Sequence, residues 1–272
     1  MALFLVFNSP LRTVRNRILR LTVTGIFQLS RITLVAIFIL CTGLQSYAMF
    51  EESLLYYPSH SKEKSDLQEW VVDEMIIGFC RTVESPRMVW LIFHGNAGQA
   101  SNRGYIAKRL PQSDSVYVME YPGYGSRAGT PSMPSFNLAA TQAYEILRRT
   151  YPSHRIGVFG ESLGSGPASF LGSLPDPPGR IVLVVPFDDL LSLAKDTFRF
   201  LPVSLLMRDK WDNVSALAKY TGRIDIFGAA QDTIIPVHHA RNLADKLPSA
   251  RYSELQCGHN EWSSGNLLKI ED

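Results

Sequence analysis

The sequence predicts an α/β protein built on a mostly parallel sheet, and two observations carry that prediction. From about residue 70 onward, short apolar runs alternate with helical patterns, which is the order of successive β-α-β units. Two of the runs, MVWLIF over 88–93 and IVLVV over 181–185, are continuously apolar, as strands buried on both faces of a parallel sheet are. A chain of 272 residues is long enough for one large domain and an appendage.

The individual strands and helices are predicted from the spacing of apolar residues and from the turn residues on either side of each segment. The predicted strands are 70–81, 88–94, 116–120, 155–159, 181–185, 224–228 and 250–255. The predicted helices are 101–110, 135–149, 163–171 and 237–247. The segment 187–223 is too short for a large cap domain over the sheet. Its apolar residues suit either an acyl-chain slot or membrane contact, or a helix that packs on the sheet.

Composition excludes several classes of protein. Hydrophobic residues make up 46% of the chain and charged residues 19%, which excludes a disordered protein and allows a sizeable core. A net charge of +2 gives no polyanion-binding signature, so no nucleic-acid partner is expected. Three cysteines are too few for a disulfide scaffold. Cys80 and Cys257 could pair, or both could be buried strand-end residues.

The N-terminal region differs in charge from the rest. Arginine is the only charged residue type in residues 1–50, and residues 32–50 carry no charge. An apolar stretch of this length, preceded by arginines, predicts a transmembrane signal anchor with the rest of the chain outside the cytoplasm. A signal peptide cleaved after Ala48, or an ordinary helix, are the alternatives. The predicted organisation is a basic leader (1–31), the anchor (32–50), a linker (51–68) and an α/β domain (69–272).

The motif with the clearest chemistry is GESLG at residues 160–164. It has the form G-x-S-x-G and lies between a predicted strand and a predicted helix, where a tight turn exposes the serine hydroxyl above the sheet. The helix that follows presents backbone N–H groups to developing negative charge. Ser162 is therefore the candidate nucleophile; an ordinary glycine-rich turn is the alternative.

A serine hydroxyl needs a base and an orienting acid. Three histidines follow Ser162, and His259 lies just past the last predicted strand, whereas His238 and His239 begin a helix. Asp232 follows the strand 224–228 and is the preferred acid. Asp188 and Asp189 are the competing acids.

The sequence HGNAG at residues 94–98 directly follows an apolar strand. A His-Gly loop at this place can direct a backbone N–H into an oxyanion hole. The N–H groups of Asn96 and Leu163 are the predicted oxyanion donors. His94 is expected to shape the loop rather than to act as a base.

Taken in order, HGNAG, YPGYGSRAGTPS, GESLG, QDTIIP and GHN resemble the α/β-hydrolase superfamily. More narrowly, they are similar to its N-terminally membrane-anchored serine hydrolases, which include protein depalmitoylases and lysophospholipases. The resemblance covers about residues 50–262. It implies an α/β-hydrolase fold with a small or absent cap and an N-terminal transmembrane helix. It also implies cleavage of carboxylic esters or thioesters through an acyl-enzyme on the triad Ser162, Asp232 and His259.

The remaining expectations concern ligands. No metal-ligand spacing and no dinucleotide or phosphate-loop motif is present, so neither a metal nor a cofactor is expected. The expected partners are a small-molecule or lipid substrate and the membrane. A serine peptidase on the same fold and a non-catalytic interaction protein are the alternative functions. The acyl group, the leaving group and the oligomeric state are left open.

Overall fold

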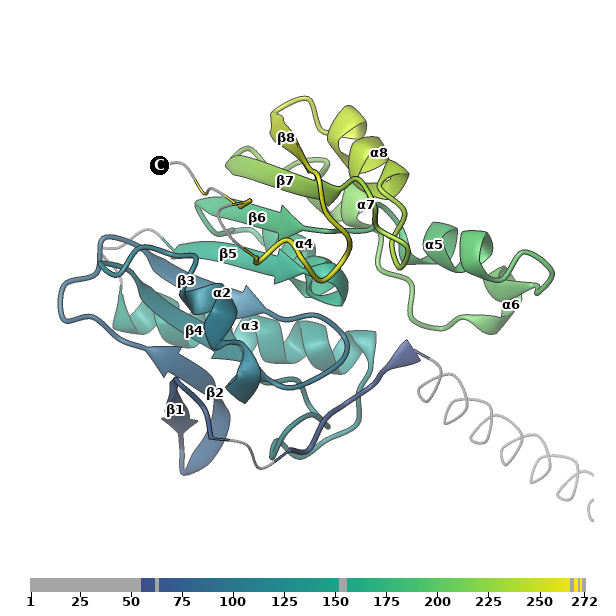
Figure 1. Cartoon of the computed structure of the whole chain (residues 1–272). Coiled ribbons are helices and arrows are strands. Elements are labelled where there is room, and N and C mark those ends of the chain that lie inside the picture. Colours follow the sequence, from purple (N-terminus) through teal and green to yellow (C-terminus); the bar gives the residue numbers. More distant parts are fainter. Residues whose placement is uncertain (1–54, 62–63, 152–155, 265–266, 269, 271–272) are drawn as a thin grey trace, which may run out of the picture. The chain divides into compact units, whose positions relative to one another are not determined.

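An eight-stranded sheet forms the centre of the protein (Figure 1). The computed structural model describes residues 55–61, 64–151, 156–264, 267–268 and 270. The predicted anchor, residues 32–50, lies outside these residues. Within the described part of the chain, no helix is both long and apolar enough to cross a bilayer.

The strands follow one another closely in sequence. They are β1 Gln68–Val72, β2 Met75–Arg81, β3 Val89–Phe93, β4 Ser115–Met119, β5 Ile156–Glu161, β6 Arg180–Val184, β7 Arg223–Ala229 and β8 Ala250–Leu255. The helices are α2 Gly104–Ala107, α3 Met133–Thr150, α4 Ser165–Gly172, α5 Leu190–Thr197, α6 Val203–Leu206, α7 Asn213–Leu217 and α8 His238–Lys246. Two short 3-10 turns complete the set: η1 Ala100–Asn102 and η2 Ser162–Gly164.

The order of strands across the sheet is β1-β2-β4-β3-β5-β6-β7-β8. All pairs from β4 to β8 are parallel, whereas β2 pairs antiparallel with both β1 and β4. The prediction of a mostly parallel sheet is therefore confirmed. The chain runs from β3 to β4 on one side of it and then crosses over to β5 on the other side, so β3 lies between β4 and β5 in the centre of the sheet.

Two apolar clusters cover the two faces of the sheet. In β3, Leu91 and Phe93 belong to one cluster and Trp90 and Ile92 to the other, as the alternation along a strand requires. Helices α3, α4, α7 and α8 supply side chains to the first cluster. Helix α2 and the segment around Trp262 supply the second. Because β3 is covered on both sides, its five residues are all buried, which explains the continuous apolar run in the sequence.

The single strand predicted over 70–81 is wrong, because this stretch forms a hairpin of β1 and β2. Asp73 and Glu74 join the two strands with positive φ angles of 49° and 64°. Two successive left-handed residues are the signature of the tight hairpin turn that matches strand twist. Neither residue is the glycine or asparagine that usually marks such a turn.

The helix predicted over 101–110 is also shorter than expected. The chain makes the 3-10 turn η1, leaves helical geometry at Arg103 and resumes as the four-residue α2. Gly104 begins α2, and glycine is a weak helix former. The Ala100 backbone N–H, at the start of η1, donates to the buried Glu120 carboxylate rather than to a carbonyl of the helix.

The structure differs from the expected linker over 51–68 as well. Tyr56 is only 4% exposed and packs against Phe136 and Trp211 of the main core. Pro58 pairs with Gly98 as an isolated β-bridge, and Gly125 donates to the Ser59 carbonyl. Residues 55–61 are thus a strap packed on the domain, and β1 begins within the former linker at Gln68.

Between β6 and α7 the chain forms a small insert that contains α5 and α6 (Figure 1). Asp189 caps α5 by accepting from the N–H groups of Leu191 and Ser192, both at 3.1 Å. Leu190 and Val203 are buried, whereas Phe200 and Leu205 are 100% and 84% exposed. The insert therefore packs on the domain through Leu190 and Val203, whereas the acyl-chain slot or membrane contact stays a prediction.

Cys80 and Cys257 are free thiols. Cys80 lies in β2 near one edge of the sheet, and Cys257 follows β8 at the other edge. The expected alternative of buried strand-end residues therefore holds, and the pairing does not. Burial raises the pKa of the Cys80 thiol.

Candidate active site

Ser162 stands at the turn between β5 and α4 in a strained backbone conformation. Its φ angle is 53°, which is uncommon for a non-glycine residue. A Cβ atom at Gly164 would lie 2.1 Å from the Phe93 carbonyl oxygen, and one at Gly160 would lie 2.6 Å from the Gly164 carbonyl oxygen. Only glycine therefore fits at either position. This is the physical reason for the G-x-S-x-G spacing.

The three residues predicted as a triad lie within hydrogen-bond distance of one another. Nε2 of His259 is 3.0 Å from Oγ of Ser162, and Nδ1 of His259 is 2.7 Å from Oδ2 of Asp232. With its proton on Nδ1, His259 donates to Asp232 and accepts from the Ser162 hydroxyl. The arrangement places a base next to the serine and a carboxylate behind the base.

The loops that carry Asp232 and His259 are joined to each other. Asp232 follows β7 and His259 follows β8, which are neighbours in the sheet. The Ala230 and Gln231 N–H groups donate to carbonyls of the β8 loop at 2.8 and 3.0 Å. The second oxygen of Asp232 accepts from the N–H groups of Ile234 and Ile235 at 2.9 and 2.8 Å. These backbone hydrogen bonds orient the Asp232 carboxylate independently of its contact with His259.

The loop HGNAG follows β3, the strand beside β5, so it lies next to the serine turn. No described residue accepts a hydrogen bond from the Asn96 backbone N–H. Leu163 is in the first turn of η2, where backbone N–H groups have no partner within the helix. Both predicted oxyanion donors are thus available to a ligand.

The Asn96 side chain holds this loop to the N-terminal strap. Its Oδ1 accepts from the Tyr57 N–H at 3.1 Å and from the Tyr124 hydroxyl at 2.9 Å. Its Nδ2 donates to the Leu55 carbonyl at 2.6 Å. With its side chain fixed at three points, Asn96 presents its backbone N–H in one orientation.

His94 is fully buried, and its imidazole is held inside the protein. Nδ1 lies 2.8 Å from the Gly95 carbonyl and Nε2 lies 3.3 Å from Oε1 of Glu120. The ring also packs against Tyr121 and Tyr124. These contacts shape the loop, as expected from the sequence. The run YPGYG after β4 therefore forms the wall behind the oxyanion loop.

Glu161 is a residue of the site that sequence reasoning missed. It directly precedes the serine and is buried. Its carboxylate accepts from the Gly95 N–H at 2.9 Å, from the Trp262 indole at 3.1 Å and from the Tyr105 hydroxyl at 2.7 Å. One carboxylate thus joins the oxyanion loop to the segment after His259. Its place inside the motif, as a charged residue at the end of a buried strand, was the available signal.

Burial, together with the charge of Glu161, raises the pKa of the Tyr105 hydroxyl. Tyr105 therefore keeps its proton at any physiological pH and remains a donor to Glu161. The network behind the serine turn consists of hydroxyl, indole and amide donors that all face one acceptor.

The alternative acids do not reach His259. Asp188 instead lies 2.6 Å from Nδ1 of His239, and Asp189 caps α5. Burial raises the pKa of Asp188, but hydrogen bonds from His239 and from the Asp189 N–H outweigh it and leave the pKa below its usual value. His238 lies 2.9 Å from Asp196. The structure thus brings together the preferred acid and base rather than their competitors.

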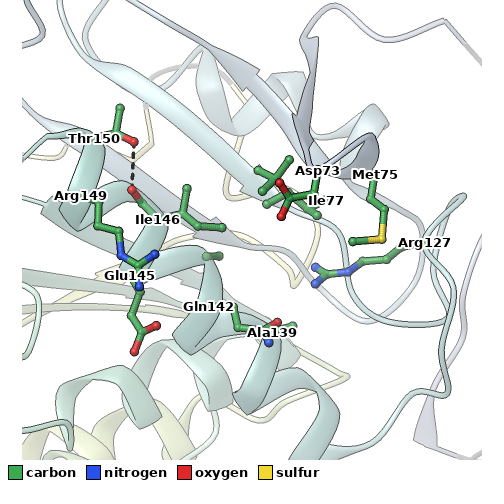
Figure 2. Close-up of a pocket in the computed structure, with 12 residues that line it drawn as sticks. Asp73, Met75, Ile77, Arg127, Ala139, Gln142, Glu145, Ile146, Arg149 and Thr150 are labelled. Carbon is green, nitrogen blue, oxygen red and sulfur yellow. Dashed lines mark hydrogen bonds between the residues drawn. The ribbon is translucent and has the colours of Figure 1, made fainter.

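A groove of about 560 Å³ lies between the β1–β2 hairpin and α3 (Figure 2). The hairpin contributes Asp73 and Met75, the helix contributes Glu145 and Arg149, and Arg127 lies between them. None of the triad side chains lines this groove. Because its lining carries both acidic and basic side chains, the groove does not indicate one class of ligand.

Several known proteins are similar to this chain in sequence. No family model matches the chain. An uncharacterized protein of Mycobacterium tuberculosis is 31% identical over 180 residues, which cover 63% of this chain and 62% of that protein. Alpha/beta hydrolase domain-containing protein 17B of Xenopus laevis is 27% identical over 178 residues, 62% of this chain and 58% of that protein. Lysophosphatidylserine lipase ABHD12 of Mus musculus is 25% identical over 179 residues, 58% of this chain and 45% of the lipase. The match therefore spans less than two thirds of each of these relatives.

Solved structures agree on the fold. The Pyrococcus furiosus esterase Pf2001 matches with a TM-score of 0.59 at 14% identity, over 76% of this chain and 91% of the esterase. The esterase EaEST of Exiguobacterium antarcticum matches with a TM-score of 0.53 at 16% identity, over 74% of this chain and 94% of the esterase. The strand order, the serine turn and these solved structures together show that the chain has the α/β-hydrolase fold, and its relatives in sequence include proteins named as an α/β-hydrolase and as a lipase.

Proposed function

We propose that the protein is a serine hydrolase that cleaves carboxylic ester or thioester bonds through an acyl-enzyme. The observation that carries the proposal is the hydrogen-bonded series Ser162–His259–Asp232, with the serine on a strained turn. Strain at a single non-glycine residue persists only where the surrounding structure imposes it, and such residues cluster at active sites.

In the first half of the reaction, Oγ of Ser162 attacks the carbonyl carbon while Nε2 of His259 takes the hydroxyl proton. Asp232 stabilises the imidazolium that forms. The N–H groups of Asn96 and Leu163 bind the negative oxygen of the tetrahedral intermediate. The carbon–oxygen or carbon–sulfur bond then breaks, and His259 gives its proton to the departing alcohol or thiol.

In the second half, a water molecule attacks the acyl-serine and gives a proton to His259. Collapse of the second tetrahedral intermediate breaks the bond to Oγ, and the proton returns to Ser162. The products are a carboxylic acid and the free enzyme. The same two backbone N–H groups serve both intermediates, which is why their fixed orientation matters.

The proposed substrate class is a lipid or another acyl compound. Two features support it: a relative is named as a lysophosphatidylserine lipase, and the insert carries exposed apolar side chains at Phe200 and Leu205. Isolated apolar residues are common on surfaces, but strongly exposed aromatic and aliphatic side chains on one small insert suit contact with acyl chains.

We further propose that residues 32–50 anchor the protein in a membrane, with the hydrolase domain on the non-cytoplasmic side. The support is the uncharged stretch of these residues and the arginines before it. A reporter fused after Asp272 should then be found outside the cytoplasm. A reporter confined to the cytoplasm would contradict the orientation and leave the hydrolase proposal unaffected.

The hydrolase proposal is tested with a fluorophosphonate probe and a p-nitrophenyl acyl ester. The native protein should be labelled, and S162A should lose both labelling and ester turnover. D232N should keep its fold but turn over ester at least a thousandfold more slowly, because the imidazole loses its orienting acceptor. S169A is the matched control, since Ser169 is a buried serine on α4 whose hydroxyl makes no hydrogen bond to any residue that the structure describes. Equal labelling of S162A and native protein would show that Ser162 is not the nucleophile.

A further inference from the structure

A second cluster of ionisable side chains lies where α5 of the insert meets α8 (Figure 1). Asp196 comes from α5, and His238 and His239 are the first two residues of α8. One ligand atom from each of the three lies within 4.8 Å of the others. None of them takes part in the hydrogen bonds of the Ser162 triad.

His239 has a nitrogen atom that the protein leaves without a partner. The side chain is 2% exposed, and its Nε2 makes no hydrogen bond within the described residues. Leaving a buried polar atom unpaired costs stability, so native proteins rarely do so without a reason. This Nε2 faces Oδ2 of Asp196 at 3.5 Å.

The other nitrogen of the same ring is firmly held. Oδ1 of Asp188 lies 2.6 Å from Nδ1 of His239, and Asp188 also accepts from the Asp189 N–H at 2.8 Å. A carboxylate on Nδ1 keeps the proton there and leaves the Nε2 lone pair free. Histidines that bind a metal almost always have such a partner on the nitrogen that does not bind the metal.

The spacing of the ligand atoms fits a small tetrahedral cation. With metal–ligand bonds of about 2.0–2.1 Å, two ligand atoms of a tetrahedral zinc site lie about 3.3 Å apart. Nε2 of His238 is 2.9 Å and Nε2 of His239 is 3.5 Å from the same Asp196 oxygen. These two separations lie on either side of the ideal one. Small side-chain rotations would bring all three atoms to one ion.

We propose that Asp196, His238 and His239 bind a zinc-type divalent cation, with Asp188 orienting His239 and water completing the coordination. Two imidazoles and one carboxylate favour zinc over magnesium or calcium, which prefer oxygen ligands. The absence of a metal motif in the sequence is explained by distance, because Asp196 lies 42 residues before His238. The cation would join α5 to α8 and so hold the apolar insert against the domain.

The test is a titration of the full-length protein with Zn²⁺, followed by calorimetry and by competition with a chromogenic zinc indicator. One ion should bind per chain and raise the midpoint of thermal unfolding. The Co²⁺ form should show the intense visible absorption of a tetrahedral site. H238Q and D196N should each weaken binding at least tenfold and lose this absorption. Both residues are about half exposed, so their replacement should leave the fold intact.

H60Q is the matched control, because His60 is an exposed histidine on the strap and outside the cluster. Its affinity for Zn²⁺ should equal that of the native protein. The proposal is overturned if the native protein binds no Zn²⁺, or if H238Q, D196N and H60Q all bind it equally. Binding that survives in H238Q but disappears in H259A would place the ion at the triad and would also overturn it.

Discussion

At Glu161 a single side chain links three parts of the site that are distant in sequence. The carboxylate accepts from Gly95, Tyr105 and Trp262, and each of these groups can only donate to it. The backbone of the same residue leads directly into the strained Ser162. We therefore infer that Glu161 is a positioning residue: it acts on the oxyanion loop and on the histidine segment without touching substrate.

The variant E161Q should retain the fold and lose most of its catalytic rate. The glutamine side chain has only one acceptor oxygen. Its NH₂ group would face one of the three donors, which are the Trp262 indole, the Tyr105 hydroxyl and the Gly95 backbone N–H, and could not accept a hydrogen bond from it. Each lost hydrogen bond to a charged acceptor costs about 1.5–3 kcal/mol. We expect a stability loss of about 2 kcal/mol by urea unfolding and a kcat at least tenfold lower, with KM changed much less.

E254Q is the matched control for this prediction. Glu254 also accepts hydrogen bonds through both oxygens, from Arg241 at 2.8 Å, but the pair is on the surface. Exposed pairs contribute little to stability, so E254Q should keep native kcat and KM. A kcat for E161Q equal to that of E254Q would show that Glu161 is structural only.

At the scale of elements, the serine turn depends on close contact between α4 and the end of β3. Gly164 sits against the Phe93 carbonyl with no room for a side chain. The contact is with backbone of the central strand, which cannot move without disturbing both faces of the sheet. The glycine therefore sets how closely the helix N-terminus approaches the oxyanion loop.

G164A should be strongly destabilised, because a methyl group 2.1 Å from the Phe93 oxygen forces α4 away from β3. We expect a loss of about 4 kcal/mol or more in the free energy of unfolding, or insoluble protein. G179A is the control, because a Cβ atom there would have only the Ile156 carbonyl oxygen, at 4.0 Å, as a neighbour. Its stability should lie within about 1 kcal/mol of native. Equal stability of the two variants, measured by urea unfolding, would contradict this account of the turn.

The strands differ in how well the sequence predicts them. The strands from β3 to β7 were predictable because each is a short, mostly apolar run between turn residues, and the sheet buries both faces of most of them. The hairpin of β1 and β2 was not, because Asp73 and Glu74 adopt left-handed geometry without a glycine. Local sequence signals fail where tertiary pairing, rather than residue preference, decides the conformation.

Across the whole molecule, the triad candidates could be named because chain order and motif position restrict them. Ser162 and His259 are 97 residues apart, yet the turn after β5 and the loop after β8 bring Oγ and Nε2 to within 3.0 Å of each other. The cluster of Asp196, His238 and His239 could not be named, because α5 and α8 meet only in the folded chain. Nor could the strap be found, since the short segment 55–61 (LYYPSHS) shows no helix or strand period and only Tyr56 is deeply buried.

Tyr56 connects the strap to α3 and to Asp209, and its removal should affect stability and activity together. The ring packs on Phe136 of α3, and its hydroxyl donates to Asp209 at 2.5 Å; Asp209 also accepts from the N–H at the start of α3. Y56A should lose about 3–5 kcal/mol of unfolding free energy, as buried aromatic truncations do. Y56F keeps the ring and should lose about 1–2 kcal/mol.

The neighbouring Y57A supplies the matched control, because Tyr57 is 55% exposed and contacts Asn96 through its backbone N–H. Its stability should change by about 0.5 kcal/mol or less, since its side chain contributes little buried area. In Y56A, by contrast, the strap loosens, and the Leu55 and Tyr57 backbone groups that hold the Asn96 side chain shift with it. Ester turnover at 25 °C should therefore fall in Y56A even where the protein is still folded, and an unchanged kcat in folded Y56A would show that the strap supports the fold without orienting the oxyanion loop.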